Sequence, residues 1–346
     1  MGPRSRLSLA GINLMVFLAL VLLAEGGARL LAGPEARPLF DDGALRTRGR
    51  PFVAPHPRRG FALIPGYSGP LYHIDGQGFR AAPPAPAGAP LLVALGESTT
   101  FGWDVPDDGT YPAQLQELAA ARGPALEVVN AGVPSYSSTQ VLLYLEEILE
   151  RRRPAGLLVS ILWNDIWYST ALNWYPRLLI HQQPPVWLAR ALRHSALLRV
   201  ILLKSRPDQA AVVDRFNPEA LAQYASNLRA MLEVARARGV PLILVEPPFC
   251  PDLLPPEGLN EFHVRYTRDF FLETARQYRR TMKSLAAQYG APVLDHRLSL
   301  ENGGGPRELF LDLLHPSAAG NRLMAEDLLE GLMEIRGILP FDAEIE

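Results

Sequence analysis

Short apolar segments alternate with longer segments of helical periodicity through residues 91–338, and this alternation restricts the possible fold more than any other feature. The apolar segments end beside glycine or polar residues and are found at 91–95, 126–129, 156–163, 240–245 and 292–294. Continuous apolar runs of this length are typical of strands that are buried on both faces of a parallel sheet.

The segments between these strands carry apolar residues at helical spacing. They cover 111–122, 138–152, 218–238, 266–289 and 316–338. Strands that alternate with helices in this way form a parallel sheet whose right-handed crossovers place helices on both faces. The sequence therefore predicts an α/β fold with a parallel five-stranded sheet, in one domain that covers residues 91–338.

The N-terminus carries a membrane signal. Arg4 and Arg6 precede an uncharged, mostly apolar run at 7–24, whose length lies near the lower limit for a helix that spans a bilayer. The arginines favour a cytoplasmic N-terminus, which places the remaining chain in the periplasm or at the cell surface. Small residues around Ala24 would permit signal cleavage and secretion. We expect residues 1–29 to form a membrane anchor or signal segment, and favour the uncleaved transmembrane helix.

Two further regions interrupt the pattern. Residues 30–90 are rich in proline, glycine and arginine, and predict a juxtamembrane connector that is partly draped over the domain. A helical insertion is expected at about 167–217. Its apolar stretch at 186–203 is too charged to span a bilayer, and fits an amphipathic lid, a patch on the membrane surface or ordinary helical packing.

Composition excludes several functional classes. The net charge of −2 gives no electrostatic basis for nucleic-acid binding. A single cysteine, Cys250, rules out a disulfide within the chain. No set of histidine, cysteine and carboxylate residues has structural-zinc spacing, and no glycine-rich loop follows a strand in the phosphate-binding pattern. We therefore expect neither a metal nor another cofactor.

Polar residues of catalytic types follow the predicted strands. Ser98 follows the first strand, Gly132 the second and Asn164 the third, while Asp312 and His315 precede the last helix. In an open parallel sheet, ligands bind beyond the C-terminal ends of the strands. The sequence thus predicts that these separate segments converge on one rim of the sheet.

Their chemistry is that of nucleophilic catalysis. A serine hydroxyl is a weak nucleophile, and His315 is suited to accept the Ser98 proton because imidazole titrates near neutrality. Asp312, three residues earlier, can hold the second imidazole nitrogen and fix its tautomer. Backbone N–H groups of Ser98 and Gly132 and the side-chain amide of Asn164 can stabilise an oxyanion.

One alternative base and one alternative fold deserve comparison. His296 also follows a strand and adjoins Asp295, but it lacks the spacing of three residues to a carboxylate, so His315 is preferred. The Gly-x-Ser-x-Gly elbow of α/β-hydrolases is not met, because Thr100 occupies its last position.

The same residues fall in four blocks that resemble those of SGNH (GDSL-like) hydrolases of the bacterial, membrane-anchored type. The blocks are GESTTFG at 96–102, NAG at 130–132, WND at 163–165 and DLLHP at 312–316. They occur in the order of that family, and the resemblance extends from about residue 78 to 332. Glu97 stands where the family usually has aspartate, and Trp163 stands near a position that is often glycine.

The resemblance implies a flavodoxin-like three-layer sandwich and a serine esterase, lipase, thioesterase or acyltransferase activity. It implies catalytic roles for Ser98, Asp312 and His315, and oxyanion roles for Ser98, Gly132 and Asn164. The preferred hypothesis is hydrolysis of a small-molecule or glycan ester through an acyl-enzyme. The membrane tether motivates an alternative, an acyltransferase or deacetylase that acts on a cell-envelope glycan. A third hypothesis is a tethered binding protein that has lost activity.

Overall fold

The computed structural model describes residues 3–31, 46–47, 50–122, 125–169, 195–198, 212–213, 216–261 and 264–335. At its centre lies a sheet of parallel strands, β5 (Leu91–Gly96), β6 (Glu127–Gly132), β7 (Gly156–Ser160), β9 (Leu242–Val245) and β12 (Val293–Leu294). Their order across the sheet is β12-β9-β7-β5-β6. Counted along the chain this is the flavodoxin-like order 2-1-3-4-5, so the predicted five-stranded parallel sheet is confirmed.

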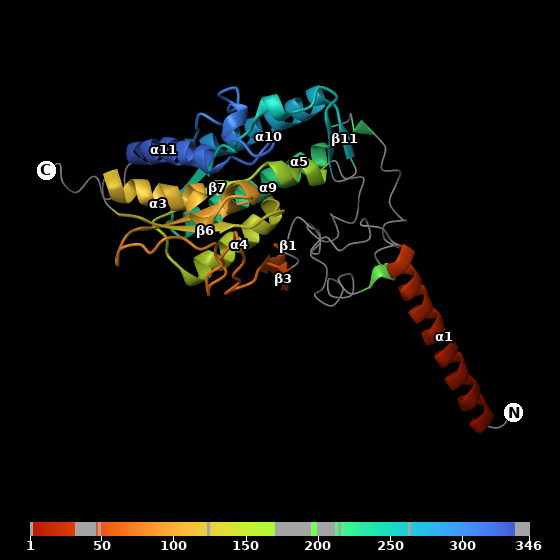
Figure 1. The fold of residues 1–346 in the computed structure, drawn as a ribbon. Helices are drawn as coiled ribbons and strands as arrows, with labels where there is room; N and C mark the ends of the chain where they lie inside the picture. Colours follow the sequence, from red (N-terminus) through yellow and green to blue (C-terminus); the bar gives the residue numbers. More distant parts are fainter. Residues whose placement is uncertain are drawn as a thin grey trace.

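Helices cover both faces of this sheet (Figure 1). The helices are α3 (Tyr111–Arg122) and α11 (Ala318–Glu334) on one face, and α4 (Ser138–Arg151), α9 (Pro218–Ala237) and α10 (Arg268–Tyr289) on the other. Alternation along β5 separates the two layers, because Leu92 and Ala94 pack with α3 and α11 while Val93 and Leu95 pack with the other helices. The three-layer sandwich is therefore confirmed.

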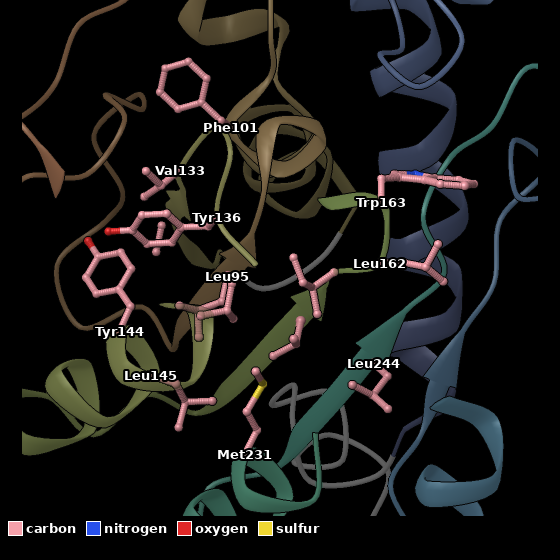
Figure 2. Packing of buried hydrophobic residues seen from close by; sticks show 14 of the residues in the cluster. Leu95, Phe101, Val133, Tyr136, Tyr144, Leu145, Leu162, Trp163, Met231 and Leu244 are labelled. Atoms are coloured by element: carbon pink, nitrogen blue, oxygen red, sulfur yellow. The ribbon is translucent and has the colours of Figure 1, made fainter. Parts of the chain in front are cut away.

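The larger of the two apolar clusters lies on the α4 and α9 side of the sheet. Figure 2 shows Leu95 and Leu244 from the strands, with Leu145 and Met231 from the covering helices, in this cluster. Burial of such side chains stabilises the fold by roughly 1.5–3 kcal/mol each, so this layer holds the strands that carry the rim residues.

Helix boundaries follow local capping. The helix expected from 266 begins at Arg268, because the Thr267 side chain accepts a hydrogen bond from the Phe270 N–H. The residues before it form β11 (Val264–Tyr266), which joins β10 (Leu259–Glu261) and β8 (Val212–Val213) in a small sheet that the sequence did not predict. Short 3-10 helices lie in loops at η4 (Asp107–Gly109), η6 (Pro251–Leu253) and η7 (Arg307–Leu309).

Part of the predicted connector at 30–90 packs against the sheet domain. Its described part contains β1 (Arg46–Thr47), β2 (Arg50–Pro51) and the antiparallel pair β3 (Val53–His56) and β4 (Gly60–Leu63). Phe52, Phe61 and Tyr72 are buried in the same cluster as the sheet residues. Packing in the described residues therefore extends back to Phe52, which the sequence pattern did not indicate because isolated aromatic residues in a proline-rich stretch produce no periodic signal.

Arg80 is a buried arginine of this N-terminal segment whose guanidinium makes several hydrogen bonds. The arginine is 1% exposed and donates to the backbone carbonyls of Phe101, Gly102 and Val105 at 2.6–2.8 Å. Its Nε lies 2.7 Å from Asp107 Oδ1, so the buried charge is paired. The guanidinium also stacks on the rings of Tyr72 and Phe101 at 4.5 Å from each centroid. One side chain thereby fixes the loop that follows Ser98.

The N-terminal helix α1 (Pro3–Leu31) stands apart from the sheet (Figure 1). Its window Gly11–Leu30 has a mean hydropathy of 1.9 and 0% of it is buried, so it is long and apolar enough to cross a membrane. A signal sequence would have the same properties. Near its end, the Glu25 carboxylate accepts hydrogen bonds from Ser195 Oγ and from the N–H groups of Ala196 and Leu197.

The predicted insertion at 167–217 lies mostly outside the described residues. This applies to its apolar stretch at 186–203, apart from 195–198, so the lid and membrane-surface hypotheses stay predictions.

Replacement of Arg80 by methionine should destabilise the fold strongly. Three buried carbonyls and the Asp107 carboxylate would lose a charged donor, at a cost of about 3 kcal/mol in the free energy of unfolding. Urea unfolding of the detergent-solubilised chain, followed by tryptophan fluorescence, measures this. The matched change at the exposed Arg153 should cost less than about 0.5 kcal/mol. Equal effects at the two positions would contradict the role given to Arg80.

Candidate active site

Ser98 is the first residue of a short helix that follows β5. A single residue, Glu97, separates helix α2 (Ser98–Phe101) from the end of β5 at Gly96. A Cβ at Gly96 would lie 2.2 Å from Thr100 Oγ1 and 2.4 Å from the Ser160 carbonyl oxygen. Only glycine therefore permits the close approach of α2 to the strand ends, which places Ser98 at the rim.

Ser98, His315 and Asp312 form a continuous chain of hydrogen bonds. Ser98 Oγ lies 2.8 Å from His315 Nε2, and His315 Nδ1 lies 2.7 Å from Asp312 Oδ2. The other oxygen, Asp312 Oδ1, accepts hydrogen bonds from the N–H groups of Leu314 and His315 at 2.9 Å. The structure thus brings together the three residues for which the sequence predicted catalytic roles.

Electrostatics favour a charged carboxylate at Asp312. Burial opposes its ionisation, but the hydrogen bond and charge of His315 and the two N–H donors outweigh burial, and the pKa of Asp312 falls below its ordinary value. An ionised Asp312 accepts a hydrogen bond from the Nδ1–H of His315, which leaves Nε2 able to accept a proton from Ser98.

Asn164 is held shortly after the end of β7 by contacts with the Glu97 side chain and the Tyr136 carbonyl. It is the second residue of α5 (Trp163–Ser169), which follows β7. Its side-chain Nδ2 donates to the Tyr136 carbonyl oxygen at 3.0 Å. Because an amide nitrogen carries two hydrogens, one N–H remains for another acceptor.

Gly132 is at the predicted strand end, but its N–H is already engaged. It donates to Asn130 Oδ1 at 3.0 Å, while Asn130 Nδ2 donates to the Thr100 carbonyl oxygen at 2.9 Å. A Cβ at Gly132 would lie 2.2 Å from the Phe101 nitrogen. The packing of α2 on β6 therefore explains this glycine without an oxyanion role.

Glu97 has a larger role than its sequence position indicated. Its carboxylate is 1% exposed and accepts hydrogen bonds from the N–H groups of Leu162, Trp163 and Asn164 at 2.9–3.2 Å. Burial raises the pKa of Glu97 to about 8. The three N–H donors lower this pKa, and the nearby charge of Asp165 raises it. The residue before Ser98 thus holds the start of α5. The signal in the sequence was the acidic residue that directly follows an apolar strand.

Asp165 ties the same turn to the helical layer. Its carboxylate accepts hydrogen bonds from the Ser138 N–H at 2.8 Å and from Ser138 Oγ at 2.6 Å. Ser138 Oγ in turn accepts from Asn227 Nδ2 at 2.8 Å. Burial raises the pKa of Asp165 to about 6. The start of α5 is therefore joined to α4 and α9 by side chains that sequence reasoning had not connected.

Two residues near the rim have left-handed backbone angles. Ser135, in the loop after β6, has φ 65°, and Asp104, after α2, has φ 55°. Neither is glycine, so each conformation carries a local cost of about 1–2 kcal/mol. Ser135 precedes Tyr136, whose carbonyl contacts Asn164. Sequence patterns gave no indication of either residue.

His296 is excluded as the base by its own contacts. It is 2% exposed, and its Nε2 lies 2.6 Å from the Glu246 carbonyl oxygen. Its Nδ1 accepts a hydrogen bond from the Leu298 N–H. Burial lowers the pKa of His296, which favours a neutral structural histidine. Within the described residues, no group of three or more His, Cys, Asp or Glu residues is placed to hold a metal ion.

The parallel sheet with a serine, histidine and carboxylate at its C-terminal rim defines the chain as an α/β serine hydrolase. The model of the GDSL-like Lipase/Acylhydrolase family matches residues 94–323. The chain belongs to this family, and is an SGNH-type serine hydrolase that acts on ester bonds. A comparison with curated proteins found no significant match.

Solved structures with a similar fold are esterases or related proteins. TesA is 20% identical to this chain, with a TM-score of 0.46. The match covers 72% of this chain and 99% of TesA. The psychrotrophic esterase EstA from Pseudoalteromonas sp. is 13% identical with a TM-score of 0.44, covering 70% and 97%. A mutant of Axe2, an acetyl-xylooligosaccharide esterase from Geobacillus stearmophilus, is 19% identical with a TM-score of 0.45, covering 70% and 93%.

The buried carboxyls predict how stability depends on pH. A carboxyl whose pKa is higher in the folded protein than in the unfolded chain contributes stability below its unfolded pKa, and loses this contribution as pH rises through its folded pKa. The folded pKa is about 8 for Glu97 and about 6 for Asp165. The free energy of unfolding should therefore decrease as the pH rises from the unfolded pKa of each carboxyl to its folded pKa. The expected slope is roughly 1 kcal/mol per pH unit, measured by urea unfolding between about pH 5 and 8.

Glu97→Gln should flatten this pH dependence, whereas the same change at the exposed Glu308 should leave the slope as in the wild type. An unaltered slope in Glu97→Gln would show that Glu97 does not hold a proton in this range.

Proposed function

We propose that the protein hydrolyses a carboxylic ester through an acyl-enzyme on Ser98. The observation that carries this proposal is the hydrogen-bonded chain from Ser98 Oγ through His315 to Asp312, with distances of 2.8 and 2.7 Å. Family membership supports esterase chemistry in general, and the geometry supports these three residues as the groups that perform it.

In the first step Ser98 Oγ attacks the ester carbonyl carbon while its proton passes to His315 Nε2. The carbonyl electron pair moves to oxygen and gives a tetrahedral oxyanion. This intermediate collapses, the bond to the alcohol oxygen breaks, and His315 returns the proton to the leaving alkoxide. Water then attacks the acyl-enzyme with His315 as the base, which releases the carboxylic acid and restores Ser98.

The oxyanion needs donors that are oriented before the reaction. We assign the backbone N–H of Ser98 and the remaining Nδ2 hydrogen of Asn164 to this role. Glu97 supports the assignment because it fixes the Asn164 backbone through a 2.9 Å hydrogen bond. Gly132 could contribute only if its N–H released Asn130 Oδ1.

The apolar helix α1 supports a second element of the proposal, that the enzyme is anchored in a membrane with its catalytic domain outside the cytoplasm. Arg4 and Arg6 at its start favour the cytoplasmic position of the N-terminus. An anchored site suits an ester that is polymeric or lipid-linked more than one that diffuses freely. Acyl transfer to a glycan hydroxyl would use the same acyl-enzyme, with a sugar in place of water.

Ser98→Ala should abolish ester hydrolysis. Loss of the nucleophile should lower kcat by a factor on the order of 10⁶. Release of p-nitrophenol from acetate, butyrate and octanoate esters by the detergent-solubilised chain measures this. Ser284→Ala, a change at an exposed serine on α10, is the matched control and should keep full activity.

A serine-directed phosphonate should add its mass to the peptide that contains Ser98 in the wild type, and to no peptide in Ser98→Ala. Ester turnover that persists in Ser98→Ala would refute the assignment. A wild-type protein that neither turns over esters nor takes up the phosphonate would favour the inactive, tethered binding protein.

Asn164→Ala should retain part of the activity. Removal of one oxyanion donor should lower kcat by roughly 10²–10³, because the Ser98 N–H remains. The same p-nitrophenyl assay measures the effect, with urea unfolding as a check that the variant folds. A fully active Asn164→Ala enzyme would exclude Asn164 from the oxyanion hole.

A further inference from the structure

An indole ring lies directly beside the histidine that returns the proton. The centroid of the Trp103 ring is 6.3 Å from that of His315, and the two rings are inclined at 41°. Trp103 is half-buried, so part of the indole remains accessible. In the proposed reaction His315 protonates the leaving alcohol. The group next to His315 therefore faces the alcohol side of the ester rather than the acyl side.

The loop that carries Trp103 is held by hydrogen bonds from Arg80 and Tyr72. Arg80 holds the carbonyls of Gly102 and Val105, on either side of Trp103 and Asp104. The Tyr72 hydroxyl donates to Asp104 Oδ1 at 3.1 Å and accepts from the Asp104 N–H at 3.0 Å. The Tyr72 ring also packs at 6.1 Å from the indole. Trp103 is thus held in place before any ligand binds.

This fixation maintains a conformation that costs energy. Asp104 has φ 55°, a left-handed angle that L residues other than glycine adopt at a cost, yet its side chain is exposed. Local strain that is maintained by the surrounding structure is concentrated at functional sites. Here it holds the Asp104 carboxylate against the Tyr72 hydroxyl, while the Tyr72 ring packs against the indole that adjoins His315.

Acidic residues follow Trp103 in this loop, and its partly buried ring also packs against the apolar cluster. Asp104 and Asp108 are exposed, and Asp107 is partly exposed but already bonded to Arg80 and His73. An alkyl chain on this side would lie against carboxylates, and an anionic group would be repelled by them. A neutral sugar fits better, because its C–H face can cover the indole and its hydroxyls can donate to the free oxygen of Asp104.

We propose that Trp103 and Asp104 form a subsite for a neutral sugar, so that the leaving alcohol of the ester is a carbohydrate hydroxyl. This inference rests on the proposed esterase function and specifies its substrate class. Trp103 stacks on the sugar ring, Asp104 accepts a hydrogen bond from one of its hydroxyls, and Tyr72 and Arg80 act as positioning residues.

The test compares two acetate esters with the detergent-solubilised full chain. One is a mono-O-acetyl methyl glucoside and the other is ethyl acetate, which has the same acyl group but no sugar, and acid release is followed by titration at constant pH. The ratio of kcat/KM for the sugar ester to that for ethyl acetate should fall about tenfold in Trp103→Ala, chiefly through KM. Trp103→Phe keeps an aromatic ring and should retain most of the ratio.

Asp104→Asn tests the second contact without removing the indole. It should lower the same ratio about threefold to tenfold, as expected for one hydrogen bond to a charged group. Asp252→Asn, at an exposed carboxylate outside the loop, is the matched control and should leave both kcat/KM values unchanged.

A ratio that stays constant in both Trp103→Ala and Asp104→Asn would overturn the sugar subsite, even if both esters became poorer substrates. Failure of the underlying function has a different signature, since neither ester would then show Ser98-dependent turnover in the wild type.

Discussion

The burial of one guanidinium, that of Arg80, connects the N-terminal segment to the loop beside the candidate site. A buried charge is tolerated only when it is paired and its donors are used, and here three carbonyls and Asp107 meet that requirement. The carbonyls belong to the residues that follow Ser98. The path of the chain after the nucleophile is therefore set by a residue that precedes the sheet, and the N-terminal segment is part of the active unit.

A second buried polar group acts on the opposite side of Ser98. Glu97 accepts hydrogen bonds from the first N–H groups of the turn that carries Asn164. The residue directly before Ser98 therefore fixes the backbone of Asn164. Asp165 extends the connection to Ser138 at the start of α4. The rim is thus organised by buried carboxyl groups, whose hydrogen bonds are strong in low dielectric and costly to lose.

The sequence predicted those features that depend on local pattern. Strand and helix periodicity gave the sheet, and the motif order gave Ser98, Asp312 and His315, which the structure places in contact. Features that depend on distant partners were missed. The N–H of Gly132 is engaged by the Asn130 side chain, which the distant Thr100 carbonyl holds in place, and the role of Arg80 follows from carbonyls more than twenty residues away. Neither contact leaves a periodic trace in the sequence.

The hydrogen bonds of Glu25 connect the first helix to a second part of the chain. Its carboxylate caps the backbone at 196–197, in a segment of the chain that continues from α5 and hence from Asn164. In a membrane-anchored enzyme this contact would hold residues 195–197 near the lipid–water boundary, because Glu25 lies near the end of the apolar window. Proteolytic release at Ala24 would then separate that cap from the rest of α1. The released chain would keep Glu25 and its contacts with 195–197, and would lose the apolar part of the helix that precedes them.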